Sequence, residues 1–346
     1  MRRSTILIGL FTLASTALAH CGAPAPVVPG AISPAQLQGV AEHKRGQVSV
    51  FDDLYGDPIL AGITTGPDGA LWFTDVGNDV IGRITTQGQY TLSVRAGAEL
   101  ADGIVTGPDG NLWFTEEEEY GGIGRITPKG VVKLFADPGG EYPNGITVGP
   151  DNALWFAESN GTVGRMTTKG KVTHFTVAAS NATLQGIVTG PDGRLWVTEY
   201  VVGGSRLANA VIALSTDGTY KTYDTGSGRY GAGPDFICVG PDKALWFAEA
   251  GNDALGRMTT SGKYSEFPTN YEYGQPSGIV SSHGALWFTD FAGRFGIGRM
   301  TTSGKTTFYK VPGSDPEITE IATGPGNALW FTSSLGPSAI GRIQTR

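Results

Sequence analysis

The stretch Gly103–Glu116, which reads GIVTGPDGNLWFTE, decides the fold because the chain repeats it from end to end. Every tryptophan of the protein occupies the same place in one copy of this pattern. The seven are Trp72, Trp113, Trp155, Trp196, Trp246, Trp287 and Trp330. Successive tryptophans are 41, 42, 41, 50, 41 and 43 residues apart, which is the spacing typical of β-propeller blades.

Each copy predicts four short antiparallel strands. A Gly-Ile-Val/Thr strand leads through a Gly-Pro-Asp-Gly turn, in which proline fixes φ and glycine accepts a positive φ, into a Leu-Trp-Phe-Thr strand. An Ile-Gly-Arg-Ile strand and a fourth strand follow, as in Ile123–Thr127 and Val131–Phe135. The 53 glycines show no period of three and fit a chain with many tight turns. We therefore predict an all-β, seven-bladed β-propeller of four-stranded antiparallel blades.

The two ends of the repeat array complement each other. The last copy stops after its third strand, Ile340–Ile343, while Gln47–Phe51 resembles a fourth strand with no blade before it. We predict that the N-terminal strand completes the last blade, which would close the ring and leave no open sheet edge.

The first residues predict export. Residues 1–19 combine Arg2 and Arg3 with the apolar run Ile6–Leu18 and small residues at the expected cleavage point, as in a signal peptide. Residues 20–46 are rich in Ala and Pro and then polar, which predicts a tether before a propeller over residues 47–346. We expect a secreted or periplasmic protein with no transmembrane segment.

Two cysteines and an acidic composition limit the other possibilities. Cys21 follows a sequence that resembles a lipobox, so a lipid anchor at Cys21 stays open beside release as a soluble protein. Cys238 falls in a predicted core strand, so no disulfide framework is expected. The net charge of −7 and the absence of a basic stripe argue against nucleic acid as a partner. We expect a monomer.

Strand direction separates two faces of the ring. The Gly-Pro-Asp-Gly turns share one face, the turn face, and are nearly the same in every copy. The connections on the opposite face, the loop face, differ between copies, so ligand specificity is expected there. Two positions in each blade are predicted to border the channel on the loop face. Those before the Gly-Ile pair are Ala61, Asp102, Asn144, Gln185, Asp235, Ser277 and Thr319. Those after the second strand are Asp75, Glu116, Glu158, Glu199, Glu249, Asp290 and Ser333.

The carboxylates at these positions allow two interpretations. As a functional rim they could bind Mg²⁺ or Ca²⁺, which prefer oxygen ligands, through Glu116, Glu249 and Asp290. The pairs that Asp102 forms with Glu116, and Asp235 with Glu249, could then provide acid and base. As a repeated part of the fold, each acid would instead pair with the arginine of the third strand, which follows it by seven to nine residues in five blades.

Blade 4 departs from this pattern. Ala213 replaces the arginine there, so Glu199 is the strongest single candidate for a catalytic residue, unless Arg206 of the following loop pairs with it. Asp102 and Asp235 are the other catalytic candidates. Loop tyrosines could line a ligand pocket, namely Tyr120, Tyr200, Tyr230 and Tyr273.

The four histidines are predicted to lie away from the channel. His20 and His43 fall in the tether, His174 in an outer strand and His283 on the turn face. A histidine-based catalytic triad or metal cluster is therefore not expected.

Over residues 47–346 the repeat resembles the streptogramin B lyases, also called virginiamycin B lyases. The resemblance implies a propeller that linearises a cyclic depsipeptide antibiotic at its ester bond by Mg²⁺-assisted elimination. The family motif is Glu-Pro-His-Gly-Ile, with a second histidine one blade earlier and an acid after the next tryptophan. The matching stretch here, Gln275–Ile279, reads QPSGI, so Gln275 replaces the metal-associated glutamate and Ser277 the basic histidine. Asp235 stands in place of the second histidine, and only Asp290 keeps the acid, with one residue fewer between.

We therefore expect an exported propeller that is not an active streptogramin lyase. It would bind an unknown small molecule, or an extracellular protein or glycan, on the loop face. The alternative is a divalent-metal-dependent lyase, or a lactone or ester hydrolase, that uses the carboxylates of the channel.

Overall fold

The computed structural model describes most of the repeat region. The described residues are 46–52, 54, 58–97, 100–116, 122–137, 140–201, 209–226, 233–270, 274–291, 296–313, 317–334 and 338–346. They all belong to one compact unit, His43–Arg346. The predicted signal peptide, and the predicted tether up to residue 45, lie outside the described residues.

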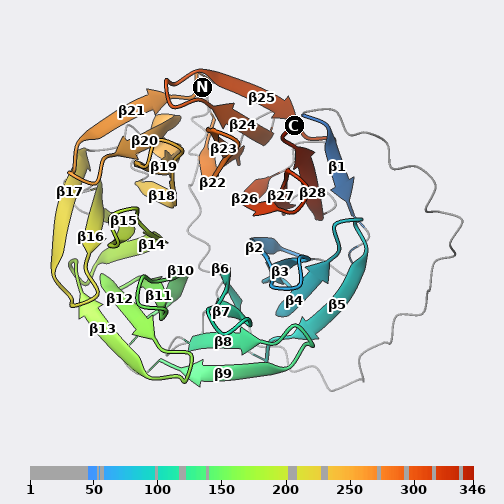
Figure 1. The fold of residues 1–346 in the computed structure, drawn as a ribbon, viewed down its shortest axis with the longest axis horizontal. Coiled ribbons are helices and arrows are strands. Elements are labelled where there is room, and N and C mark those ends of the chain that lie inside the picture. The colour runs from blue at the N-terminus through green and yellow to red at the C-terminus, as the bar shows by residue number, and fades with distance from the viewer. Residues whose placement is uncertain are drawn as a thin grey trace, which may run out of the picture. The chain divides into compact units, whose positions relative to one another are not determined.

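Seven four-stranded antiparallel sheets are arranged as the blades of a ring (Figure 1), which confirms the predicted fold. Blade 1 contains β2 (Leu60–Thr65), β3 (Leu71–Asp75), β4 (Val80–Ile84) and β5 (Tyr90–Arg95), and blade 2 contains β6 (Leu100–Thr106), β7 (Leu112–Glu116), β8 (Gly122–Ile126) and β9 (Val132–Ala136). Blade 3 contains β10 (Pro143–Val148), β11 (Leu154–Glu158), β12 (Thr162–Met166) and β13 (Val172–Thr176), and blade 4 contains β14 (Ala182–Thr189), β15 (Leu195–Val201), β16 (Asn209–Leu214) and β17 (Tyr220–Gly226). Blade 5 contains β18 (Pro234–Val239), β19 (Leu245–Glu249), β20 (Ala254–Met258) and β21 (Tyr264–Pro268), and blade 6 contains β22 (Pro276–Ser282), β23 (Ala285–Asp290), β24 (Gly296–Met300) and β25 (Thr306–Lys310). Blade 7 contains β26 (Ile318–Gly324), β27 (Ala328–Ser333), β28 (Ala339–Gln344) and β1 (Val48–Phe51).

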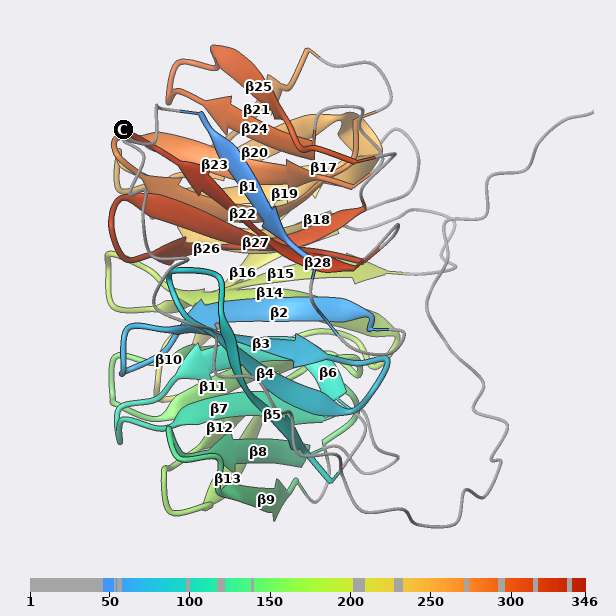
Figure 2. The ribbon, with the colours of Figure 1, turned by 90° about the vertical axis from the view of Figure 1, so that its right-hand side faces the viewer.

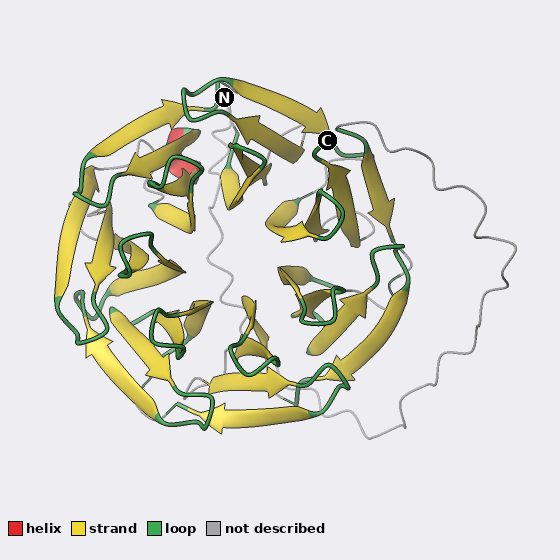
Figure 3. Cartoon of the chain, viewed as in Figure 1, coloured by secondary structure: helices red, strands yellow, loops and turns green. Residues whose placement is uncertain are grey.

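The ring consists of strands joined by turns and loops, and Figure 3 shows the short helical turn η2 (Ala250–Asn252). Among the described residues, no helix is long and apolar enough to cross a membrane. The first strand of each blade lies nearest the axis and the fourth lies at the outer edge (Figure 1). The side view in Figure 2 shows the strands of the blades running across the thickness of the ring.

The N-terminal strand closes the ring as predicted. β1 pairs antiparallel with β28, with Val48 opposite Ile343 and Phe51 opposite Ile340. Phe51 also stacks on Trp330, with ring centroids 5.5 Å apart. The seventh blade is therefore built from both ends of the propeller, with β1 as its outer strand.

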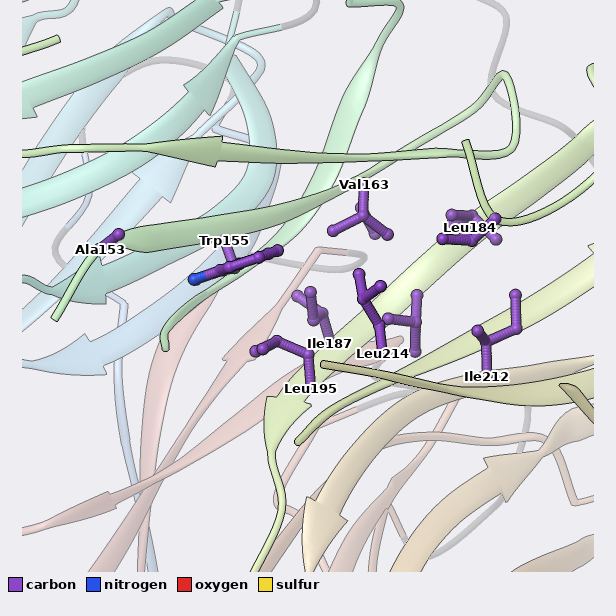
Figure 4. Packing of buried hydrophobic residues seen from close by; sticks show 11 residues of the cluster. Ala153, Trp155, Val163, Leu184, Ile187, Leu195, Ile212 and Leu214 are labelled. Carbon is purple, nitrogen blue, oxygen red and sulfur yellow. The ribbon is translucent and has the colours of Figure 1, made fainter. Parts of the chain in front are cut away.

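The tryptophans hold neighbouring blades together. All seven are fully buried. Trp155 of blade 3 packs against Leu195 and Leu214 of blade 4, and Figure 4 shows this cluster with Ile187 beside it. Burying large apolar side chains of this kind typically contributes 1.5–3 kcal/mol each, roughly.

The turn face carries a repeated hydrogen-bonding unit. In blade 3, Asp151 Oδ1 accepts a hydrogen bond from Trp155 Nε1 at 2.9 Å, and Asp151 Oδ2 accepts one from Arg165 Nε at 2.6 Å. Blades 1 and 5 repeat this arrangement. In blade 4, Arg194 of the turn itself takes the place of the missing strand arginine and bonds to Asp192 at 2.7 Å.

This unit corrects the predicted pairing of the strand arginines with the acids at the loop face. The strand register places Arg165 directly opposite Trp155. Glu158 lies three residues further along the strand, and each strand residue advances the chain by about 3.3 Å. The arginine therefore reaches the acid of the turn, and the acid at the loop face is left to other partners.

Candidate functional site

The first set of predicted channel positions lies in β-bulges of the innermost strands. In blade 3, Pro143 pairs with Glu158 and Ile146 with Phe156, so two residues of β10 oppose one of β11. Five other blades show the same register shift, and in blade 2 three residues of β6 oppose one of β7. Bulges of this kind aim a side chain away from the regular pleat and are frequent beside functional sites. Asn144, Gln185, Asp235, Ser277 and Thr319 are half-buried, and Ala61 is buried. Asp102 lies within β6, but its side chain is outside the described residues.

Asp235 and Ser277 connect blades 5 and 6 at this level. Ser277 Oγ donates a hydrogen bond to Asp235 Oδ2 at 3.4 Å. The backbone of Asp235 is fixed from the other side, because Thr198 Oγ1 of blade 4 donates to its carbonyl oxygen at 2.8 Å. The structure thus brings together two of the positions that the family resemblance singles out.

The second set of positions does not form an open rim. All six carboxylates at the ends of the second strands are buried, with exposures between 0% for Glu158 and 8% for Glu199. Asp75 Oδ1 accepts the backbone N–H of Ile59 at 3.0 Å, and Asp290 Oδ1 accepts that of Gln275 at 2.8 Å. Burial raises the pKa of Glu199.

Glu249 has a different neighbour. Tyr264 Oη lies 2.9 Å from both carboxylate oxygens of Glu249 and donates to them. Burial raises the pKa of Glu249 to about 8, against the opposing effect of the tyrosine hydroxyl. A carboxyl group with such a pKa is partly protonated at neutral pH.

The predicted metal ligands do not converge on one point. Glu116, Glu249 and Asp290 end strands in blades 2, 5 and 6. Asp235, which the sequence analysis pairs with Glu249, makes a hydrogen bond with Ser277. Tyr200 is half-buried in β15, opposite Thr183. The other predicted loop tyrosines, Tyr120, Tyr230 and Tyr273, lie outside the described residues.

A cluster that the sequence analysis missed lies between blades 2 and 3. Asp137, Glu158 and His174 have ligand atoms within 4.8 Å of one another, and no other such group of three occurs in the described ranges. His174 Nε2 is 2.8 Å from Asp137 Oδ1 and 3.7 Å from Glu158 Oε1. Burial and the neighbouring Asp137 carboxylate hold the pKa of Glu158 far above its ordinary value.

This cluster brings a histidine into a group that could hold a metal ion, which the sequence analysis did not expect. His174 lies in the outer strand as predicted, but its side chain turns toward the preceding blade. His283 does lie on the turn face, where its Nε2 is 2.9 Å from Asn327 Oδ1. The sequence did contain a signal for this cluster. An acid, Asp137, and a histidine, His174, occur at two repeat positions that carry this combination in no other repeat.

The family model of the virginiamycin B lyases matches residues 43–208 and 205–346, which together span the whole propeller. The chain belongs to the virginiamycin B lyase family. Among curated proteins no sequence match was found.

Solved structures of lyases from this family resemble the chain in sequence and in fold. A streptogramin B lyase structure is 25% identical, with a TM-score of 0.76 over 86% of this chain and 97% of the other. Virginiamycin B lyase from Staphylococcus aureus is 29% identical, with a TM-score of 0.74 over 86% of this chain and 98% of the other. A catalytically inactive variant of that enzyme with quinupristin is 29% identical, with a TM-score of 0.76 over 86% and 99%.

The Mg²⁺ that the family resemblance implies does not fit the residues found here. Gln275 offers a neutral amide in place of the metal-associated glutamate, and Asp290 Oδ1 already accepts the Gln275 N–H. Asp290 is 1% exposed, and the described residues around it form no group of three metal-binding side chains. Hard cations are held by several oxygens, usually including carboxylates. We therefore assign no chemical step at this position to Mg²⁺.

Proposed function

We propose that this virginiamycin B lyase-family member is an exported binding protein. It holds a polar small molecule at the loop-face mouth of the channel and does not linearise streptogramins. The observation that carries the proposal is the hydrogen-bonded pair of Asp235 and Ser277 at the positions where the family resemblance places its two histidines. The predicted signal peptide supports export.

The chemistry of the pair favours binding over proton abstraction. An imidazole titrates near neutral pH and can accept a proton from a substrate at that pH. A serine hydroxyl cannot, and an ordinary aspartate, with a pKa near 3.9, is a base about 400 times weaker than imidazole. Together they offer one anionic acceptor and one hydroxyl, which suit a hydroxylated or cationic ligand.

The neighbouring bulge positions extend this polar surface. Asn144, Gln185 and Thr319 present amide and hydroxyl groups from blades 3, 4 and 7, and each is half-buried. Asn144 Nδ2 is already held by the carbonyl oxygen of Leu184 at 2.8 Å, which fixes its orientation. A few positioned polar groups in a concave setting are what small-molecule sites use to orient a ligand.

The test combines a ligand screen with an activity assay. Thermal unfolding of the chain is followed with sugars, polyols and amines, and quinupristin linearisation is followed by mass change with Mg²⁺ present. We expect a ligand-dependent rise in melting temperature that Asp235→Asn removes and Asp217→Asn, an exposed change on the turn face, leaves intact. We expect no linearisation.

Turnover of quinupristin by the unmodified chain, lost in Asp235→Asn, would contradict the proposal and favour the alternative of a carboxylate-dependent lyase or hydrolase. A further variant sharpens the assignment of the site. Gln275→Glu, Ser277→His and Asp235→His combined restore the family's residue types, and any linearisation gained by this triple variant would locate the site at the same place.

A further inference from the structure

We propose that Asp137, Glu158 and His174 bind one divalent transition-metal ion, with Zn²⁺ as the expected occupant, between blades 2 and 3. The site is distinct from the Asp235–Ser277 pair, and it stands whether or not the proposed function is correct. It would join two neighbouring blades through a coordination centre.

The three side chains reach one point from three separate segments. Asp137 directly follows β9, the outer strand of blade 2. Glu158 ends β11 and His174 lies in the middle of β13, both in blade 3. Zn²⁺–ligand bonds of about 2.0–2.2 Å place two ligand atoms roughly 3–4 Å apart. The distances of His174 Nε2 to Asp137 Oδ1 and Glu158 Oε1, 2.8 and 3.7 Å, are close to this requirement.

The carboxylates lack the partners that burial demands. Asp137 and Glu158 are both 0% exposed. Apart from His174 and the contact of the two carboxyl groups with each other, no donor in the described part of the chain reaches their oxygens, and neither pairs with Lys or Arg. A third acid, Glu141, adds negative charge nearby. Removing an anion from water costs several kcal/mol, roughly, unless it is paired or coordinates a metal ion.

Comparison among the blades shows that the fold does not require these residues. By strand register, the position of Asp137 is apolar or threonine in five other blades, and in blade 7 it falls outside the described residues. These equivalents, all buried, are Ala96, Val177, Thr225, Thr269 and Val311. The position of His174, opposite the middle of the third strand, is filled elsewhere by six other residues. These are Val50, Ser93, Leu134, Thr222, Glu266 and Phe308.

The donor set indicates the class of metal. One imidazole nitrogen with carboxylate oxygens suits Zn²⁺ and similar first-row ions, whereas Mg²⁺ and Ca²⁺ prefer oxygen alone. Three protein ligands leave a coordination position for water. The backbone closes the other side, because a Cβ at Gly140 would collide with Asp137 Oδ2 and Glu158 Oε1. The His174 side chain is 23% exposed, which gives an ion a route from solvent.

The experiment measures Zn²⁺ binding to the full chain. The protein, prepared without a histidine tag, is treated with EDTA, dialysed and titrated with Zn²⁺ by calorimetry, and bound metal is counted by mass spectrometry. We expect one Zn²⁺ per chain at this site and a saturable rise in melting temperature, because an ion that binds only the folded state stabilises it. Co²⁺ in place of Zn²⁺ should give the visible absorption of a low-coordinate site.

The variants are taken from the equivalent positions of other blades, so that they remain compatible with the fold. Asp137→Val and His174→Ser place at this site the residues found at Val177 and Ser93. Each should weaken Zn²⁺ binding at least a hundredfold and remove the Co²⁺ absorption. The metal-free melting temperature of Asp137→Val should equal or exceed that of the parent, since a buried charge is lost.

Two controls separate coordination from mere packing. Gly140→Ala keeps all three ligands but crowds their oxygens, and should also weaken Zn²⁺ binding. Glu249→Gln changes the equivalent acid of blade 5 and should leave Zn²⁺ binding unchanged. Failure of the parent chain to bind Zn²⁺, or undiminished binding by a folded Asp137→Val or His174→Ser protein, would overturn the proposal.

Discussion

The second strand of blade 3 has an acid near each end, and the surroundings of the two acids shift their pKa values in opposite directions. In blade 3, Asp151 precedes the strand on the turn face, and Glu158 ends it on the loop face. The Asp151 carboxylate accepts hydrogen bonds from Trp155 and Arg165, and these hold its pKa below the ordinary value despite partial burial. Glu158 is fully buried beside a second carboxylate, and its pKa is raised.

The contrast distinguishes what the fold needs from what one blade has added. The acid of the turn accepts a hydrogen bond from the tryptophan of its own blade wherever it occurs. Its pKa is lowered in five blades, at Asp68, Asp109, Asp151, Asp192 and Asp242. The acid at the loop face meets a backbone N–H in blades 1 and 6, a tyrosine in blade 5, and an acid with a histidine in blade 3. Surroundings that change from blade to blade indicate function more strongly than surroundings that repeat.

The largest expected effect tests the loop-face end. The folded-state pKa of Glu249 is about 8, above its ordinary value of 4.5, so the stability that its protonated form provides is complete below pH 4.5. That stability is lost as the pH rises toward 8. Glu249→Gln should remove this loss. The unfolding free energy of the variant, relative to that of the parent, should therefore increase by about 1.4 kcal/mol per pH unit over this range. Urea unfolding at pH 5, 6.5 and 8 measures the difference.

The hydroxyl of Tyr264 provides the matched variant for this experiment. Tyr264→Phe removes a hydrogen bond that favours the ionised carboxylate, so the pKa of Glu249 should rise further and the decline in stability should continue to a higher pH than in the parent. Parallel pH profiles for the parent and Glu249→Gln would show that Glu249 is ionised at neutral pH. The acids at the two ends of the second strand would then not differ in the way proposed.

A smaller effect tests the turn-face end. Asp151→Ala leaves Trp155 Nε1 and Arg165 without their common acceptor. Stability should fall by about 2–3 kcal/mol at pH 7, because a buried donor loses its partner. Asp217→Ala removes an exposed acid from another turn on the same face and should cost much less. The unfolding free energies of both variants are measured in urea. Equal losses of stability would show that the turn acid has no structural role.

The smallest effect divides the turn unit into its parts. Arg165→Met removes an ion pair whose side chains are about a quarter exposed. It should cost less than about 1 kcal/mol, and the cost should shrink in 1 M salt. Arg299→Met is the control, because Arg299 lies 5.8 Å from the Trp287 ring and the turn of blade 6 has no aspartate. A loss that is equal in both variants and insensitive to salt would assign the effect to the ring contact alone.

The fold could be predicted because each blade repeats the same local signals. Tryptophan spacing, glycine turns and alternating strands determine the number of blades, and the unpaired segment Gln47–Phe51 already indicated how the ring closes. These features depend on neighbours in sequence or on a strict period.

The site was less predictable because its contacts cross between blades. Asp137 and His174 belong to different repeats, and only the stacking of blade 3 on blade 2 brings them to Glu158. The seven to nine residues between Glu158-type acids and the strand arginines suggested a pair, but the register places Arg165 opposite Trp155. Burial of the acids at the loop-face ends of the second strands also follows from the stacking of neighbouring blades. The sequence of a single repeat gives no information on this stacking.

The pairing of β1 with β28 also determines when the propeller can be finished. Val48 and Ile343 lie about 300 residues apart in the chain, so the clasp is among the most non-local contacts the protein makes. A chain emerging from the ribosome carries its first strand from the start, yet that strand has no partner until the last one has been synthesised. Six blades can assemble from adjacent segments, while the seventh must wait until β28 has been synthesised. A chain interrupted before Ala339 would therefore retain an open ring.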